Sequence, residues 1–395
     1  MSVFDGLGVR TIINAKGTAT RLSGGILRPE VAAAMAEASQ SCVDMAELQA
    51  AASRVIADVT GAEAGYIASG ASACLLLATA ACIAGLDPGR MARLPDTRGL
   101  RNEVIMVRSQ RNFYDHAIRA AGATIVEVGL PDRYSGAGVR DAESWEIEDA
   151  ITDYTAAIHY VADAAAQPPL AEVVAIARRY KIPVFVDAAA QLPPQSNLKR
   201  FIAEGADLVA FSGGKVIGGP QASGILCGKR DLVMSAALQH LDLDVFAGMW
   251  TPPASLIDKH RLKGTPQHGI GRSCKAGKEE IAGLLTALRL FVAEGDKARH
   301  GRWLSVLREV ERGLQGIKAS VSLEGGDDPH MIPVLALGVG AGRNATDVAL
   351  ALQAGTPSVH LDPVRRAANV LLVNPVCVTP DDVAALVAAI RAVLD

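Results

Sequence analysis

Residues 211–221 read Phe211-Ser212-Gly213-Gly214-Lys215-Val216-Ile217-Gly218-Gly219-Pro220-Gln221, so one lysine lies in a glycine-rich loop that carries no other charge. The largely apolar run 206–211 leads into this loop and predicts a short buried strand. Glycine lets a ligand approach the backbone closely, and partial desolvation lowers the pKa of an amine so that it can act as nucleophile and base. A solvated lysine at the tip of a turn would have the same local sequence, so this stretch alone leaves both interpretations open.

A second candidate residue lies at the end of a predicted buried strand upstream. Residues 183–186 read Pro-Val-Phe-Val, and Asp187 follows them. An aspartate in this position costs free energy unless it has a cationic partner, and the protonated ring nitrogen of pyridoxal phosphate is such a partner. Helix capping is the competing explanation for the same residue.

A candidate phosphate cradle follows the predicted strand 64–68. The next residues, Ser69, Gly70, Ala71, Ser72 and Ala73, are all small. Backbone amides at a helix N-terminus can point at an anion there, although small residues also serve tight packing. The Gly-Lys-Thr/Ser ending of a Walker A loop is missing. A phosphate cradle, a strand-end aspartate and a lysine follow one another in this order in the aspartate-aminotransferase-type, or fold-type I, pyridoxal phosphate enzymes.

Two residues are candidates for covering the ring of such a cofactor. Phe113 and His116 follow the predicted strand 103–107. Ligands of open α/β sheets collect at the carboxyl ends of strands. Either side chain could therefore lie against a flat ring, and both could equally be ordinary packing residues.

Three cationic residues are candidates for binding the substrate. Arg21 lies in a loop of Thr, Ser and Gly, where it could clamp a carboxylate or could be a surface residue. Arg272 and Lys275 come at the end of an irregular segment, 239–272, that is rich in Pro, Gly, His and Trp. They could present two positive charges to an anion, or they could be the solvated start of the predicted helix 278–294.

Composition argues against several classes of protein. The 395 residues carry a formal net charge of −3, which gives no electrostatic reason to expect a nucleic acid as partner. The six cysteines are scattered singly, so we expect no metal site and free thiols in a reducing compartment. Because the sequence shows neither a signal peptide nor a convincing membrane span, we expect a cytoplasmic protein that does not bind membranes.

The lysine-containing run 211–222 resembles the lysine motif of the bacterial selenocysteine synthase family, the L-seryl-tRNA selenium transferases. Four other segments match that family, namely 14–18, 59–63, 121–129 and 275–281. The resemblance extends over nearly the whole chain from about Thr11. It implies an α/β fold of the fold-type I, aspartate-aminotransferase-like class, with a mostly parallel seven-stranded sheet and a smaller C-terminal α+β domain. We expect an N-terminal segment 1–45, a large cofactor domain 46–275 and a small domain 276–395.

The chain also departs from the true synthases. The family core begins about ten residues in, so we expect no transfer-RNA domain ahead of it. The cradle 68–72 and the residues 188–191 after the strand-end aspartate are similar to those of the short relatives of the D-glucosaminate-6-phosphate ammonia-lyase type.

The resemblance assigns roles to individual residues. Lys215 would form the Schiff base with pyridoxal phosphate, and Asp187 would pair with its ring nitrogen. The phosphate would be held by Ser69, Gly70, Ala71 and Ser212. Gln191 would also contact the cofactor, and Arg21, Arg272 and Lys275 would face the substrate.

The expected function is that of a pyridoxal phosphate-dependent lyase. It would catalyse α,β-elimination on a small β-hydroxy amino acid or amino sugar acid and give a 2-oxo acid and ammonia. Racemase, aldolase and β-replacement transferase are alternatives with the same cofactor. By analogy with the family, we expect a homodimer or a higher homo-oligomer.

Overall fold

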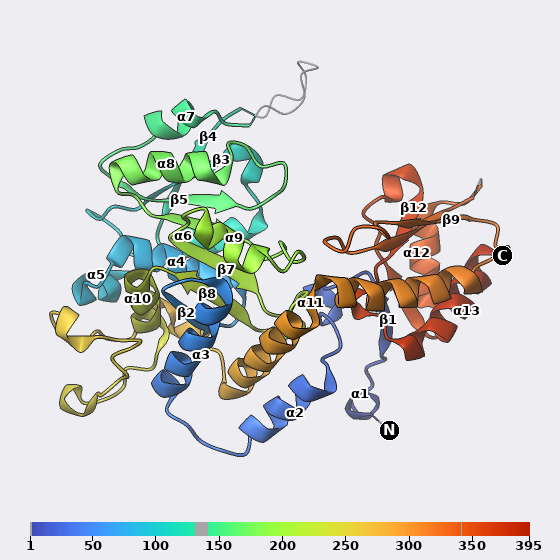
Figure 1. The fold of residues 1–395 in the computed structure, drawn as a ribbon, viewed down its shortest axis with the longest axis horizontal. Coiled ribbons are helices and arrows are strands. Elements are labelled where there is room, and N and C mark those ends of the chain that lie inside the picture. The colour runs from blue at the N-terminus through green and yellow to red at the C-terminus, as the bar shows by residue number, and fades with distance from the viewer. Residues whose placement is uncertain (1, 131–140, 341) are drawn as a thin grey trace. The chain divides into compact units, whose positions relative to one another are not determined.

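The computed structural model describes residues 2–130, 141–340 and 342–395. The chain divides into two compact units (Figure 1). Unit 1 comprises residues 1–26, 193–195 and 290–395, and unit 2 comprises residues 27–192 and 196–289. Within the described ranges, no helix combines the length and the apolar character that crossing a bilayer requires.

Unit 2 is built on a seven-stranded sheet with the order β2-β8-β7-β6-β5-β3-β4. Every neighbouring pair is parallel except the two pairs that involve β8, which is antiparallel to both β7 and β2. The strands are β2 (Ala64–Ala68), β3 (Glu103–Val107), β4 (Thr124–Val128), β5 (Thr155–Val161), β6 (Val184–Asp187), β7 (Leu208–Ser212) and β8 (Gly224–Gly228). The predicted mostly parallel seven-stranded sheet is therefore confirmed.

Every residue of the interior strands β6 and β8 is buried. Strands are buried in this way when helices cover both faces of a sheet. The helices of unit 2 are α2 (Pro29–Ala38), α3 (Met45–Thr60), α4 (Ala71–Ala84), α5 (Pro88–Arg93), α6 (His116–Ala120), α7 (Ser144–Asp149), α8 (Leu170–Tyr180), α9 (Asn197–Ala203) and α10 (Arg230–His240). Helix α4 is apolar on all sides, and most of its residues are buried in the core. Helix α3 ends at Gly61 with a φ of 73°, as the C-cap glycine in the sequence predicts.

Unit 1 has its own core and two small sheets. One sheet pairs β1 (Ile12–Ala15) with β11 (Ser358–Leu361) in parallel, and the other has the antiparallel order β12-β10-β9. The remaining elements are β9 (Ser320–Glu324), β10 (Val334–Gly338), β12 (Val370–Val373), α1 (Val3–Gly6), α12 (Ala345–Ala354) and α13 (Val383–Leu394). The capping box of Thr379 and Asp382 precedes α13, close to the helix start that the sequence predicts.

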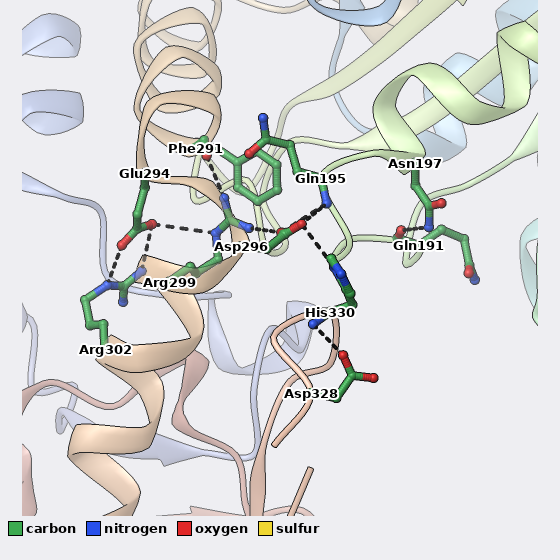
Figure 2. Close-up of polar contacts among 10 residues, drawn as sticks. All are labelled: Gln191, Gln195, Asn197, Phe291, Glu294, Asp296, Arg299, Arg302, Asp328 and His330. Atoms are coloured by element: carbon green, nitrogen blue, oxygen red, sulfur yellow. Dashed lines mark hydrogen bonds and ion pairs between the residues drawn. The ribbon is translucent and has the colours of Figure 1, made fainter. Parts of the chain in front are cut away.

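Helix α11 (Lys278–Gly313) contains a sharp kink at Gly295, whose φ is 70°. Next to the kink, the guanidinium of Arg299 is buried, with 1% of its side chain exposed (Figure 2). It donates to Asp296 Oδ1 at 2.8 Å and to the carbonyl of Phe291 at 2.6 Å, and it lies over the Phe291 ring at 3.6 Å. The carboxylate of Asp296 also accepts a hydrogen bond from the backbone amide of Gln195 at 3.0 Å. The sequence predicts a helix over 278–294, and the structure breaks helical geometry at the next residue, Gly295.

Candidate active site

The segments that carry Asp187, Lys215 and the predicted phosphate cradle follow strands that end at one edge of the seven-stranded sheet. Asp187 is in register with Ala210 of β7, and Ser212 is in register with Gly224 of β8, which in turn faces Ala68 of β2. The carboxyl ends of β2, β6 and β7 therefore lie together, and the segments that follow them are brought to the same edge. Three stretches that are far apart in the sequence thus converge.

Lys215 lies in a tight turn directly after β7. The amide of Gly213 donates to Ser223 O at 2.9 Å, and the amide of Gly219 donates to Gly213 O at 2.9 Å, so the turn closes on itself. A Cβ atom at position 213 would lie 2.4 Å from Ser223 Oγ, which explains the glycine. The side chain of Lys215 is half-buried, and burial lowers the pKa of its amine while the negative charge of Asp187 acts in the opposite direction. The amine is thus less basic than that of a solvated lysine, and it interacts electrostatically with the carboxylate of Asp187.

Asp187 is buried, with 8% of the residue exposed. Its Oδ1 accepts a hydrogen bond from the backbone amide of Ala189 at 2.9 Å. On the neighbouring strand, the buried ring of His159 stacks on Phe185, with ring centroids 4.5 Å apart. Burial lowers the pKa of His159 to about 4, although the charge of Asp187 opposes this shift. Sequence reasoning places His159 in a strand but gives it no role, because its relation to Asp187 depends on strand pairing.

The small residues after β2 form the N-terminus of α4. Gly70 is the N-cap residue, with a φ of 136°, and no side-chain hydrogen bond caps the helix. A Cβ atom on Gly224 would lie 2.3 Å from the carbonyl carbon of Gly70, so a glycine is needed on β8 for this close approach. The amide of Ser69 donates to Cys274 O at 3.2 Å, which leaves the amides of the first helical turn as the candidates for an anion.

The other predicted cofactor residues lie in different environments. Phe113 is 92% exposed, and His116 is exposed with its Nδ1 3.1 Å from Arg119 Nη2. Gln191 is half-buried in the loop after β6, and its backbone carbonyl accepts a hydrogen bond from Asn197 Nδ2 at 2.7 Å (Figure 2). That the ring is covered by Phe113 or His116 stays a prediction, as does a contact of Gln191 with the cofactor.

The predicted substrate cations fall in both units. Arg272 Nη2 lies 3.0 Å from Asp242 Oδ2, and Lys275 is exposed three residues further on. Arg21 belongs to unit 1, where it is exposed in the short helix Thr20–Leu22. Burial, together with the charge of Arg21, lowers the pKa of His360. The contact of each of these cations with substrate stays a prediction.

Pyridoxal phosphate fits the chemistry of the residues at this edge. A half-buried amine of lowered basicity can bind its aldehyde, a buried carboxylate can pair with its ring nitrogen, and an uncapped helix start can receive its phosphate. The fold and these groups define a fold-type I pyridoxal phosphate enzyme.

The profile of the L-seryl-tRNA selenium transferase family matches residues 44–244. A D-glucosaminate-6-phosphate ammonia lyase from Salmonella typhimurium is 29% identical over 100% of this chain and 98% of its own length. A 5'-C-glycyluridine monooxygenase-decarboxylase from a Streptomyces species is 32% identical over 95% of this chain and 88% of its own length. A solved structure of a D-glucosaminate-6-phosphate ammonia-lyase matches with a TM-score of 0.81 and 28% identity, covering 100% of this chain and 98% of that one.

The chain belongs to the L-seryl-tRNA selenium transferase family. It is a pyridoxal phosphate-dependent enzyme of the lyase type, and the expected similarity to the ammonia-lyase members is confirmed. The similarity to a monooxygenase-decarboxylase was not among the expectations from the sequence.

Proposed function

We propose that this enzyme removes a β-substituent from a small β-hydroxy amino acid or amino sugar acid and releases a 2-oxo acid and ammonia. The observation that carries the proposal is the similarity over the whole chain to D-glucosaminate-6-phosphate ammonia-lyase, in sequence and in fold. The convergence of Lys215, Asp187 and the α4 N-terminus at one sheet edge supports it.

Bound pyridoxal phosphate supplies an electron sink for the carbanion that forms at the α-carbon of the substrate. Lys215 would hold the cofactor, and its Nζ would accept the α-proton of the substrate. Burial favours this base function, because it lowers the pKa of the amine toward the working pH. Asp187 would stabilise a positive charge on the ring nitrogen, and its burial would strengthen this interaction because it reduces screening by water.

The substrate anion is assigned to the exposed cation Lys275 and to Arg272, with Arg21 as a further clamp. In this scheme the cofactor phosphate would be held by the amides of Gly70 and Ala71 and by the hydroxyls of Ser69 and Ser212. This list follows the resemblance to the family, and the uncapped start of α4 supports it. We further propose that the enzyme acts as a homodimer or larger homo-oligomer in the cytoplasm, without a nucleic acid partner.

Product analysis tests the proposed reaction. The holoenzyme is incubated with D- and L-β-hydroxy amino acids and amino sugar acids, each with and without a phosphate group, and ammonia and 2-oxo acid are measured. We expect stoichiometric release of both from at least one compound, and no release by Lys215→Ala. Exchange of the α-proton without ammonia would indicate a racemase, aldehyde release would indicate an aldolase, and either result would contradict the lyase.

A second candidate function is oxygen-dependent decarboxylation, which the 32% identical Streptomyces relative favours. This reaction consumes dioxygen and releases carbon dioxide, whereas elimination does neither. Oxygen uptake measured on the same panel, extended by glycyl-nucleosides, separates the two reactions. A salt-sensitive affinity for seryl-transfer RNA would instead indicate a role like that of the selenium transferase relatives.

A further inference from the structure

A chain of hydrogen bonds runs through unit 2 from a buried tyrosine to the phosphate cradle. Tyr66 Oη lies 2.8 Å from His240 Nδ1, and His240 Nε2 lies 2.9 Å from the carbonyl oxygen of Cys274. The same oxygen accepts a hydrogen bond from the backbone amide of Ser69 at 3.2 Å. Tyr66 is fully buried and His240 is 4% exposed, so water does not compete for these bonds.

The chemistry of the groups fixes the direction of the hydrogen bonds. A carbonyl oxygen can only accept a hydrogen bond. His240 Nε2 must therefore carry a proton and donate a hydrogen bond to the carbonyl of Cys274. Burial lowers the pKa of His240 and the nearby charge of Arg272 acts in the same direction, while the hydrogen bond to Cys274 opposes them. The net shift is downward, so the ring is neutral and Nδ1 accepts the hydrogen bond from the Tyr66 hydroxyl. Burial also raises the pKa of Tyr66, which keeps this hydroxyl protonated.

The acceptor of this chain belongs to the segment that carries the predicted substrate cations. Cys274 lies between Arg272 and Lys275 in sequence, and Ser69 begins the loop that leads into α4. The segment also packs closely on α10, because a Cβ atom at Gly269 would lie 2.5 Å from the Cα atom of Gln239. The carbonyl of Cys274 therefore joins the phosphate cradle to the cationic segment, and His240 holds that carbonyl from the other side.

We propose that His240 and Tyr66 are positioning residues that set the spacing between the phosphate cradle at Ser69 and the substrate cations Arg272 and Lys275. This inference rests on the proposed function, in which those cations bind the substrate anion. Loss of the Nε2 donor would leave the Cys274 carbonyl with the hydrogen bond from the Ser69 amide but without the one from His240, and would let the segment 269–275 move relative to the cradle. The affinity for an anionic substrate would then fall, while the proton transfer at Lys215 would be retained.

Two substitutions at one position separate this role from a general contribution to stability. His240→Gln keeps an N–H donor near the position of Nε2, whereas His240→Asn keeps a polar group near Nδ1 and loses the bond to Cys274. Tyr66→Phe removes only the hydroxyl that orients the ring. Ser235→Ala is the matched control, because Ser235 is buried on the same helix and its hydroxyl bonds to the Gly85 carbonyl, away from this chain.

The first measurement is amide hydrogen exchange of the holoenzyme in peptides covering 66–72 and 269–276. We expect His240→Asn to raise exchange about tenfold in both peptides, Tyr66→Phe to raise it less, and His240→Gln and Ser235→Ala to stay within twofold of the wild type. The exchange measurement needs no substrate, so it tests the positioning role of His240 even if the proposed reaction is wrong. Equal exchange in His240→Asn and Ser235→Ala, or equal damage in His240→Gln and His240→Asn, would overturn the proposal.

The second measurement is steady-state kinetics with the best anionic compound of the panel. We expect His240→Asn to raise KM about five- to tenfold with kcat within twofold of the wild type, and His240→Gln to restore KM. A fall in kcat with an unchanged KM would overturn the link to the substrate cations. If no compound of the panel reacts with the wild type, the proposed function fails, and the exchange experiment still decides whether His240 positions the segment.

Discussion

Arg272 is paired with Asp242, with Nη2 of the arginine 3.0 Å from Oδ2 of the aspartate. Asp242 Oδ1 also lies 3.2 Å from His268 Nε2, and it accepts a hydrogen bond from the backbone amide of Asp244. The hydrogen bond from Asp244 and the pairing with Arg272 lower the pKa of Asp242, so its carboxylate is charged at neutral pH. A cation that we assign to the substrate therefore already has an anionic partner, and a substrate anion must compete with it.

Asp242→Asn should tighten the binding of an anionic substrate. The carboxylate is 57% exposed, so the ion pair contributes at most about 1 kcal/mol, and its loss should lower KM by about two- to fivefold. Steady-state kinetics checks this expectation. Asp231→Asn is a matched control, because Asp231 forms a similarly exposed pair with Arg261. An unchanged or raised KM in Asp242→Asn would argue against Arg272 as the anion site.

Gly224→Ala should weaken cofactor binding. The added methyl group would lie 2.3 Å from the carbonyl carbon of Gly70, and relief of such a clash costs about 1–3 kcal/mol. We expect the dissociation constant of pyridoxal phosphate to rise about tenfold, measured by titrating the apoenzyme with the cofactor. In Gly301→Ala, where the methyl group meets nothing within 4 Å, the constant should stay the same. Wild-type affinity in Gly224→Ala would show that the α4 N-terminus does not hold the phosphate.

His159→Phe should make the fold less sensitive to acid. Burial lowers the pKa of His159 to about 4 in the folded chain, against 6.5 as its ordinary value, with Asp187 and Asp115 as the nearby charges that oppose the shift. Between these pH values the unfolded chain binds more protons, so acidification from pH 6.5 to 4 destabilises the fold by up to about 1.4 kcal/mol per pH unit. Urea unfolding of the apoenzyme at pH 4.5, 5.5 and 7 measures this slope. A slope as steep in His159→Phe as in the wild type would refute the assignment.

Arg299→Met should destabilise unit 1 strongly. The guanidinium is 1% exposed and lies between Glu294 and Asp296, so its removal leaves two carboxylates without their buried cation (Figure 2). We expect a loss of about 3–5 kcal/mol in the free energy of unfolding. Arg302→Met is the control, because Arg302 is 49% exposed and pairs with the same Glu294, so less than about 1 kcal/mol should be lost. Denaturant titration of both variants decides the question, and similar losses would contradict a special role for the buried arginine.

Much of the fold was predictable because its signals are local. The apolar runs that precede Asp187 and Lys215 became β6 and β7, and Gly61 ends α3 as its sequence context predicts. The loop glycines carry backbone requirements that can be read from a few neighbouring residues. The predicted helix 278–294 ends directly before Gly295, where helical geometry breaks, but the burial of Arg299 beside this break was not predicted because it depends on packing.

The sequence by itself determined the lysine motif around Lys215, the strand-end position of Asp187 and the order of the cofactor-binding parts, because these are properties of short stretches. Only the tertiary structure decided which groups contact one another. Tyr66 and His240 are 174 residues apart, and the partner of His240 is a backbone carbonyl, which every residue possesses and which therefore leaves no trace in the sequence. Such partners are chosen by the packing of α10 and of the segment 269–275, and that packing is a property of the folded chain as a whole.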